Sequence, residues 1–160
     1  MENRIPWMYR GLEITPADVP EGSVGFCYLV YDYTYDMIYI GKKQLTSTNR
    51  KKIGVREKKS TKTRKTFKVT VKDSDWMNYN TSCKPLQERL KTAKKGEIRK
   101  EILEFAYSKK NLSWLELKHQ VLKEVLTRGK SYNECIAGRY WARDCIKEIY
   151  DKDKERKSAK

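Results

Sequence analysis

Two tyrosines and a glycine stand directly before the most basic part of the chain. Tyr28 lies in the apolar stretch 24–31 and Tyr39 in the stretch 36–41, and a short polar tip separates them. This pattern predicts an antiparallel hairpin, and a four-residue loop would place Tyr28 opposite Tyr39 on one sheet face. Two phenols beside many cations can contact a phosphate, and Gly41 leaves room for a ligand or backbone to approach. The alternative is that both tyrosines are ordinary strand residues.

The positive charge is concentrated in one segment. The formal net charge is +15, and residues 42–72 contain thirteen Lys and Arg but a single acidic residue, Glu57. Such a concentration predicts a polyanionic partner such as nucleic acid, whereas lysines that serve only solubility would be spread among acids. Contacts of this kind are sequence-blind and salt-sensitive. The residues predicted to bind nucleic acid are Lys42, Arg50, Lys51, Lys52, Arg56, Lys58, Lys59, Lys62, Arg64, Lys65 and Lys68.

The length and the patterning predict one domain with helices and strands. With 160 residues the chain can bury a single core. We predict an N-terminal arm over 1–22, a domain over 23–150 that contains the basic insertion 42–72, and a charged tail over 151–160. Beside the hairpin, the patterning predicts a strand at 66–71, a helical turn begun by Ser74, and helices at 84–95, 112–127 and 139–150. Residues 98–107 are open to helix or strand, and their apolar end favours a strand that joins the hairpin. Gly96 and Gly129 are expected to end the first two helices.

The four cysteines and the single histidine do not form a pattern typical of structural zinc. Cys27, Cys83, Cys135 and Cys145 include no C-x-x-C pair, so any metal is expected to be a hard cation bound by carboxylate oxygens. No long apolar run is present, which predicts no membrane partner and reduced thiols in a cytoplasm.

Several short motifs together resemble one nuclease superfamily. They cover roughly residues 24 to 143 and resemble the phage SegE-like group of GIY-YIG endonucleases. The motifs are Gly25-Phe26-Cys27-Tyr28, Tyr39-Ile40-Gly41-Lys42-Lys43, Ser74-Asp75-Trp76 and Tyr132-Asn133. The resemblance implies an α+β fold with a small three-stranded antiparallel sheet flanked by helices. It also implies a phage-encoded, homing-endonuclease-like enzyme that hydrolyses phosphodiester bonds of duplex DNA with Mg²⁺ or Mn²⁺.

The same resemblance assigns roles to the tyrosines and to a basic side chain. Tyr28 would take a proton from the attacking water, provided that lysines and metal lower its pKa from about 10. Tyr39 would position the scissile phosphate. The family's arginine is displaced by the insertion, and Arg89, on the predicted helix 84–95, is the candidate to neutralise charge in the transition state. The alternative is an ordinary surface arginine, with Lys43 sharing or replacing the role.

The remaining two roles also have competing explanations. Glu116 would hold the metal ion, but Ser113 and Glu116 also have the spacing of a helix capping box, in which Glu116 bonds backbone. Metal binding requires the carboxylate to face Tyr28. Asn133 would bond a catalytic neighbour or backbone, or it is a turn residue after Gly129.

The resemblance also sets expectations for partners and location. Double-stranded DNA is the expected partner, in the host cytoplasm if a phage encodes the protein. One site per chain implies that cutting both strands needs a homodimer on DNA or two visits. The displaced arginine and the solitary carboxylate favour an alternative, a catalytically inactive nucleic-acid-binding protein of the same fold. A structural virion or ribosome-associated protein is a third possibility.

Overall fold

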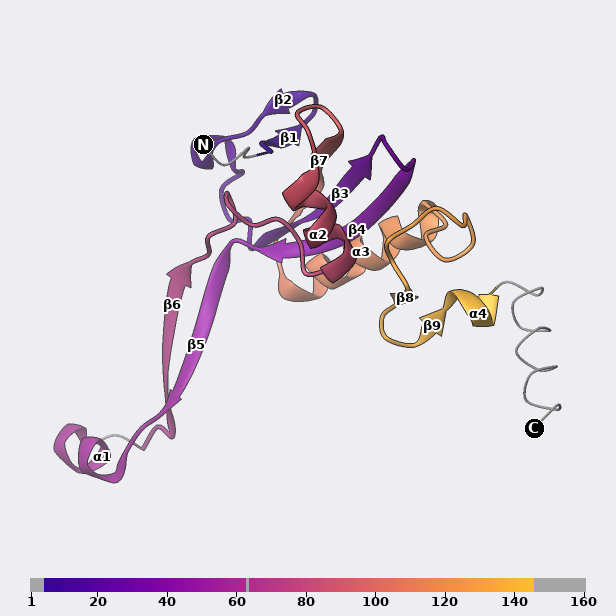
Figure 1. Cartoon of the computed structure of the whole chain (residues 1–160). Helices are drawn as coiled ribbons and strands as arrows, with labels where there is room; N and C mark the ends of the chain where they lie inside the picture. Colours follow the sequence, from indigo (N-terminus) through magenta and orange to yellow (C-terminus); the bar gives the residue numbers. More distant parts are fainter. Residues whose placement is uncertain (1–4, 63, 146–160) are drawn as a thin grey trace, which may run out of the picture.

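The computed structural model describes residues 5–62 and 64–145. Its core is a five-stranded sheet in the order β2-β1-β7-β3-β4 (Figure 1). The hairpin strands are β3 (Gly25–Asp32) and β4 (Met37–Gln44), and β7 (Ile98–Ala106) pairs antiparallel with β3. The fold is therefore α+β, and the predicted hairpin and the strand that joins it are both present.

The sheet is larger than the predicted three antiparallel strands. β1 (Trp7–Tyr9) pairs parallel with β7, and β2 (Leu12–Glu13) pairs antiparallel with β1, so the sheet is mixed. Trp7 is fully buried and its indole donates a hydrogen bond to the backbone oxygen of Trp76 (3.0 Å). A short 3-10 turn, η1 (Pro16–Asp18), follows β2. The segment 7–13 is thus built into the body because its aromatic side chains complete the core.

Each face of the sheet carries its own apolar cluster. Period-two alternation sends Phe26, Tyr28 and Val30 to one face, where the helix α2 (Lys84–Thr92) contributes Leu86. The other face packs against α3 (Lys109–Leu122) through Leu112 and Leu115. Both predicted helices exist, but α2 ends three residues early, and Gly96 lies in the following turn with φ of +89°.

The third helix differs most from its predicted bounds of 112–127. Ser108 caps α3 and its side chain accepts a hydrogen bond from the Asn111 backbone N–H (3.0 Å). The helix ends at Leu122, because Glu124 adopts a left-handed φ of 50°. Val125 and Leu126 are buried by the turn that follows rather than by the helix. The apolar stripe therefore continued past the end of the helix itself.

The basic insertion folds into a projecting ribbon. β5 (Thr46–Lys52) and β6 (Phe67–Asp73) pair antiparallel in a separate two-stranded sheet, and α1 (Val55–Thr61) lies at its far end (Figure 1). The predicted strand is β6, whereas β5 and α1 stand where a loop was expected. Residues 46–73 are called the ribbon below. Ser74 does not cap a helix: its hydroxyl bonds the Gln44 oxygen, and a simple turn follows.

The last described segment contains β8 (Cys135–Ile136), β9 (Tyr140–Trp141) and the short α4 (Ala142–Cys145). The predicted helix 139–150 therefore begins later, after β9. Its remainder and the predicted tail 151–160 lie outside the described residues. Within the described part of the chain, no helix combines the length and the apolar character needed to cross a membrane.

Candidate active site

The two hairpin tyrosines share one sheet face and pack against each other. Their ring centroids are 6.1 Å apart. The four-residue loop is 33–36 rather than 32–35, so Tyr28 lies opposite Gly41 and Tyr39 lies opposite Val30. The predicted register is thus wrong by two residues, and the tyrosines are diagonal neighbours. A shift of two keeps both on the same face, which explains why the pairing survives.

Gly41 is required by these rings rather than by an incoming ligand. A Cβ at this position would lie 2.6 Å from Tyr28 Oη and 2.8 Å from Tyr39 Cε1. Both contacts are too short for any other residue without displacement of a ring. The glycine of the Tyr-Ile-Gly motif therefore permits the close approach of the two phenols.

Burial raises the pKa of both phenols. Tyr28 is fully buried, and its hydroxyl is 3.5 Å from that of Tyr79. Removal from water raises the pKa of Tyr28 well above its usual value, with a further contribution from Tyr79. Burial likewise raises the pKa of Tyr39, although a contact with the Ser82 hydroxyl (3.3 Å) opposes the shift. Both phenols are therefore protonated at neutral pH, which is opposite to the lowered value expected for a base.

A cleft of about 550 Å³ brings together three of the predicted site residues, Tyr39, Glu116 and Asn133. It lies between β4, the start of α2, α3 and the segment 132–138. The other residues that line it are Ser82, Cys83, Lys84, Pro85, Gln120, Tyr132, Glu134, Cys135, Ala137 and Gly138. Tyr28 lies behind Tyr39 and does not line the cleft.

Glu116 belongs to the middle of α3 and does not cap it. Its carboxylate accepts from Lys42 Nζ at 2.9 Å, and the same ammonium donates to the Ser113 hydroxyl at 3.1 Å. Since Ser108 is the N-cap, the capping-box interpretation of Ser113 and Glu116 is wrong. Glu116 thus presents a partly exposed carboxylate to the cleft beside one cation.

Asn133 is bound to the backbone of β4. Its side chain accepts from the Ile40 N–H (2.8 Å) and donates to the Ile40 oxygen (2.8 Å), in the manner of a neighbouring strand. Gln120 donates to the same Ile40 oxygen at 3.4 Å. These contacts hold the segment 131–134 against the edge of the sheet. Asn133 therefore fixes the wall of the cleft next to Tyr39.

The two basic candidates for charge neutralisation lie away from the cleft lining. Arg89 is held at the tip of the hairpin, where it donates to Asp32 (2.9 Å) and to Glu97 (2.8 Å). Lys43 lies on the tyrosine face, with its ammonium 4.2 Å from the ring centroid of Tyr79, and burial lowers the pKa of Lys43. Lys84 lines the cleft, and Lys42 is joined to it by the ion pair with Glu116.

The polar residues of the cleft that sequence reasoning missed include Gln120 and Glu134. Gln120 lies one helical turn after Glu116, so the i+4 spacing on α3 was the available signal. His119 lies beside it and instead hydrogen-bonds Glu104 of β7 (2.7 Å). Glu134 follows Asn133 directly, but nothing in the sequence indicates that this segment returns to β4.

The donor set suits a hydrated hard cation. No group of three or more His, Cys, Asp and Glu side chains is found within 5–62 and 64–145 that would enclose a metal. Mg²⁺ commonly uses one or two carboxylates and takes its other oxygens from water and from substrate phosphates. Glu116 and Glu134 line the same open cleft, so they fit an ion bound in this way.

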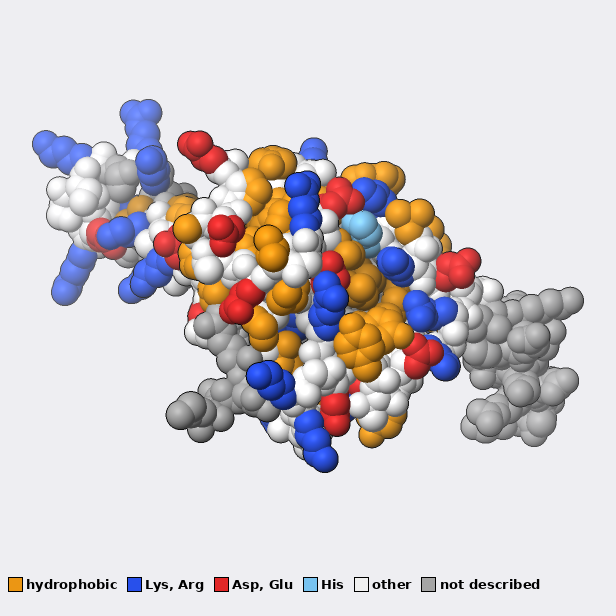
Figure 2. Space-filling model, turned by 90° about the horizontal axis from the view of Figure 1, so that it is seen from above, with side chains coloured by type: hydrophobic (Ala, Val, Ile, Leu, Met, Phe, Trp, Pro, Cys, Tyr) orange, Lys and Arg blue, Asp and Glu red, His pale blue; other side chains and the backbone are white. Residues whose placement is uncertain are grey.

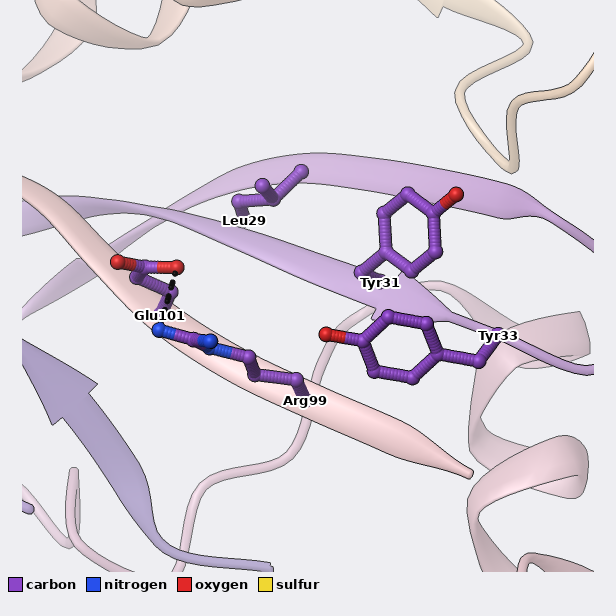
Figure 3. Close-up of a pocket in the computed structure, with 5 residues that line it drawn as sticks. All are labelled: Leu29, Tyr31, Tyr33, Arg99 and Glu101. Atoms are coloured by element: carbon purple, nitrogen blue, oxygen red, sulfur yellow. Dashed lines mark ion pairs between the residues drawn. The ribbon is translucent and has the colours of Figure 1, made fainter. Parts of the chain in front are cut away.

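The other predicted DNA-binding residues lie on the ribbon, and only Lys42 lies in the body. Figure 2 shows Lys and Arg side chains extending outward from the projecting end of the molecule. A second, smaller hollow of about 180 Å³ is separate from the cleft and shares no residue with it. There Tyr31 and Tyr33 lie beside the ion pair of Arg99 and Glu101 (3.2 Å; Figure 3).

The comparisons with known proteins agree with the motifs that surround the cleft. A search of curated proteins and a search of solved structures each gave no match. Residues 7–136 match the family model described as "Putative endonuclease segE, GIY-YIG domain". This range includes the hairpin, the ribbon, Glu116 and Asn133. The chain therefore belongs to the SegE family of GIY-YIG endonuclease domains.

Proposed function

We propose that this protein is a metal-dependent endonuclease that hydrolyses phosphodiester bonds of duplex DNA. The observation that carries the proposal is the single cleft lined by Tyr39, Glu116 and Asn133, in a chain whose net charge is +15. We further propose that the protein is phage-encoded and homing-endonuclease-like, and that it acts in the cytoplasm of the host.

Each residue of the cleft has a task that its geometry supports. Tyr39 remains a neutral phenol, so it donates a hydrogen bond to an oxygen of the scissile phosphate and orients it. Glu116, together with Glu134 of the same cleft, would hold Mg²⁺ or Mn²⁺, and Asn133 fixes the strand that carries Tyr39. When bound, such an ion polarises the phosphate and stabilises the leaving 3′ oxygen. Lys42 would exchange its bond to Glu116 for a phosphate oxygen of the DNA.

The roles of Tyr28 and the basic candidates remain predictions. For Tyr28 to accept a proton, bound metal and nearby lysines must lower a pKa that burial raises. For Arg89 to meet the phosphate, its guanidinium must leave Asp32 and Glu97. Lys43 lies next to Tyr79 and can share the positive charge near the two phenols.

The experiment is nicking of supercoiled plasmid with Mg²⁺ by the full chain. Glu116→Gln and Tyr39→Phe are expected to abolish cutting while DNA binding, measured by fluorescence anisotropy, stays intact. Glu88→Gln and Tyr107→Phe are matched controls on exposed residues outside the cleft, and they should cut like the unmodified protein. Undiminished cutting by both cleft variants would overturn the site.

A second function is favoured by three observed ion pairs. Lys42 is ion-paired with Glu116, and Arg89 is ion-paired with Asp32 and Glu97. Such pairing is expected if these side chains no longer act on phosphate. In that case the chain is a non-catalytic nucleic-acid-binding protein of the same fold. DNA binding without cutting, across several divalent metals and salt concentrations, would support this alternative. If cutting occurs, comparison of nicks with double-strand breaks at rising protein concentration shows whether a homodimer forms on DNA.

A further inference from the structure

The ribbon stands clear of the body and lacks a covering partner among the described residues. Every residue of β5 and β6 is exposed except Thr46, which is half-buried. Three large apolar side chains, Phe67, Val69 and Val71, remain in solvent. An isolated two-stranded hairpin is at best marginally stable in water. The ribbon is therefore shaped to act on something outside this chain.

Charge identifies the class of that partner. The ribbon contains eleven Lys and Arg against two acidic residues, Glu57 and Asp73. Lys51 lies directly opposite Lys68 in the pairing of β5 with β6. Like charges directly opposite each other destabilise a strand pair, unless electronegative groups lie between or above them. The ribbon is thus built for a polyanion rather than for an apolar protein surface.

The strand register divides the ribbon into two chemically different faces. One face, called the polar face, contains only side chains that can hydrogen-bond: Ser47, Asn49, Lys51, Lys68, Thr70 and Lys72. The opposite face contains Phe67, Val69 and Val71 between Thr48, Arg50 and Lys52. There the Arg50 guanidinium lies 5.3 Å from the ring centroid of Phe67, so the Arg50 side chain covers part of the Phe67 ring.

We propose that the polar face of the ribbon enters the major groove of duplex DNA and reads base edges. This inference rests on the proposed action on duplex DNA. The major groove of B-DNA, about 12 Å wide, admits a two-stranded ribbon. Each seven-residue strand is roughly 24 Å long at about 3.4 Å per residue, which is long enough to follow several base pairs. The ribbon is therefore a sequence-reading element and not only a sequence-blind clamp.

The side chains at the centre of the polar face match the acceptors and donors of bases. Asn49 can bond adenine in a bidentate manner, and Lys51 and Lys68 can donate to the O6 and N7 acceptors of guanine. Thr70, directly opposite Asn49, can meet the methyl group of thymine. The basic residues of α1 and its flanks, Arg56, Lys59 and Lys62, then lie at the far end, where they can bond phosphates.

The test is selection of bound sequences from a pool of randomised DNA duplexes, with the full chain in buffer without divalent metal. Binding is thereby separated from cutting, which the plasmid assay measures. We expect a preferred motif to emerge. Asn49→Ala should reduce the preference at one base pair by between about 5-fold and 150-fold, the range for a lost bidentate contact. Thr48→Ala, the neighbouring residue on the opposite face, should leave the motif unchanged.

A second matched pair separates base reading from simple charge. Lys51→Ala and Lys52→Ala each remove one positive charge from adjacent positions on opposite faces. Both should weaken binding to unrelated DNA to a similar extent, but only Lys51→Ala should also relax the selected motif. All four substituted residues are exposed, so thermal unfolding should be unchanged.

Three results would overturn the inference. One is selection that yields no motif, even if the protein nicks plasmid. Another is a motif that Asn49→Ala and Lys51→Ala leave intact. The third is equal binding of duplex RNA, whose major groove is too narrow for the ribbon. Failure of the proposed function would give a different result. If the protein selects a motif that depends on Asn49 but does not cut DNA with any metal, the nuclease proposal fails and the ribbon assignment stands.

Discussion

At the scale of single residues, the hairpin motif is explained by packing. Tyr28, Tyr39 and Gly41 form one contact set, in which the glycine lies under both rings. Gly25 has a comparable role on the other face, because a Cβ there would lie 2.7 Å from a methyl carbon of Leu112 on α3. The two glycines of the motif therefore set how closely rings and helix approach the hairpin.

Gly41→Ala is expected to destabilise the protein by about 1–3 kcal/mol, since an added methyl group must displace a packed ring. It should also lower the nicking rate, because Tyr39 moves. The matched control is Gly54→Ala, at a position with an ordinary φ of −67° and no atom within 4 Å of the new Cβ. Urea unfolding compares the two. Equal stability of both variants would contradict the packing explanation.

The buried phenols make stability depend on alkaline pH. The pKa values of Tyr28 and Tyr39 are raised by burial, and burial together with Asp32 raises the pKa of Tyr132 to about 12. A raised pKa means that the stabilising contribution is complete below pH 10 and is lost as the pH rises through the folded value. The free energy of unfolding should therefore fall above pH 10.

Tyr28→Phe should make that alkaline fall shallower, by up to about 1.4 kcal/mol per pH unit for one phenol. Denaturant unfolding of both proteins from pH 8 to pH 11 measures the difference. The comparison at pH 8 serves as the control, because there the variant loses only the hydroxyl contacts with Tyr79 and Thr81. Parallel curves above pH 10 would show that Tyr28 is not held in its neutral form.

Arg89 offers a test that separates a structural role from a catalytic one. Its partner Asp32 is fully buried and also accepts from the Tyr132 hydroxyl (2.9 Å). Arg89→Met would leave that carboxylate without its cation and should cost about 3–5 kcal/mol of stability. Lys91→Met, which breaks an exposed pair on the same helix, should cost at most about 1 kcal/mol. Unchanged melting of Arg89→Met with lost nicking would instead support the arginine as a phosphate contact.

At the scale of elements, the edge of the sheet is closed by a segment that has no strand pattern. Ile38 forms a single parallel bridge with Ser131, and its oxygen accepts from the Tyr132 N–H (2.8 Å). Asn133 continues this pairing with its side chain at Ile40. The backbone groups of Ile38 and Ile40 on the edge strand β4 are thereby hydrogen-bonded. The same segment forms the second wall of the cleft.

Asn133→Ala should destabilise the protein by about 1–3 kcal/mol, because it leaves the Ile40 N–H without its bonded partner beside the cleft. It should also reduce cutting, since residues 131–134 lose their attachment. Asn78→Ala removes an asparagine bonded to exposed Asp75, and a change within about 0.5 kcal/mol is expected. Thermal melts and nicking assays check both. A neutral Asn133→Ala would mean that the backbone contacts alone hold the segment.

How far the sequence predicts these elements depends on whether the signal is local. Aromatic and β-branched residues around a polar tip predicted the hairpin within 24–41, the apolar end of 98–107 favoured a strand over a helix, and Pro85 helped to find α2. The start of α3 was missed because Ser113 and Glu116 have the spacing of a capping box. The true N-cap, Ser108, accepts a hydrogen bond from the first turn of the helix but has no acidic residue three positions later. The cleft combines residues from four distant segments, so Gln120 and Glu134 depend on tertiary contacts that no local pattern contains.

At the scale of the whole molecule, a compact body carries one extended basic element (Figure 1). Leu45 and Ser74 border the ribbon, and the Ser74 N–H donates to the Leu45 oxygen at 2.8 Å. The two ends of the ribbon therefore meet, as they would across a tight turn. None of the described residues between them is buried, so the body does not rely on the ribbon for its core.

Replacement of residues 46–73 by Asn-Gly should leave thermal unfolding of the body unchanged and weaken DNA binding strongly. If six of the basic side chains lie on phosphates, the slope of log binding constant against log salt should become shallower by about 5. Anisotropy titrations at several salt concentrations measure the slope, with the complete chain as the control. An unchanged slope would place the DNA on another surface of the protein.

A single buried residue, Leu45, joins the strand that bears Tyr39 to the first strand of the ribbon. Its N–H bonds the Val24 oxygen, which leaves little freedom for the two parts to swing against each other. If the ribbon reads bases and the cleft cuts DNA as proposed, this connection holds the recognised nucleotides and the cleaved bond at a constant distance from each other. The cuts should fall at a set number of base pairs beside the recognised sequence rather than within it.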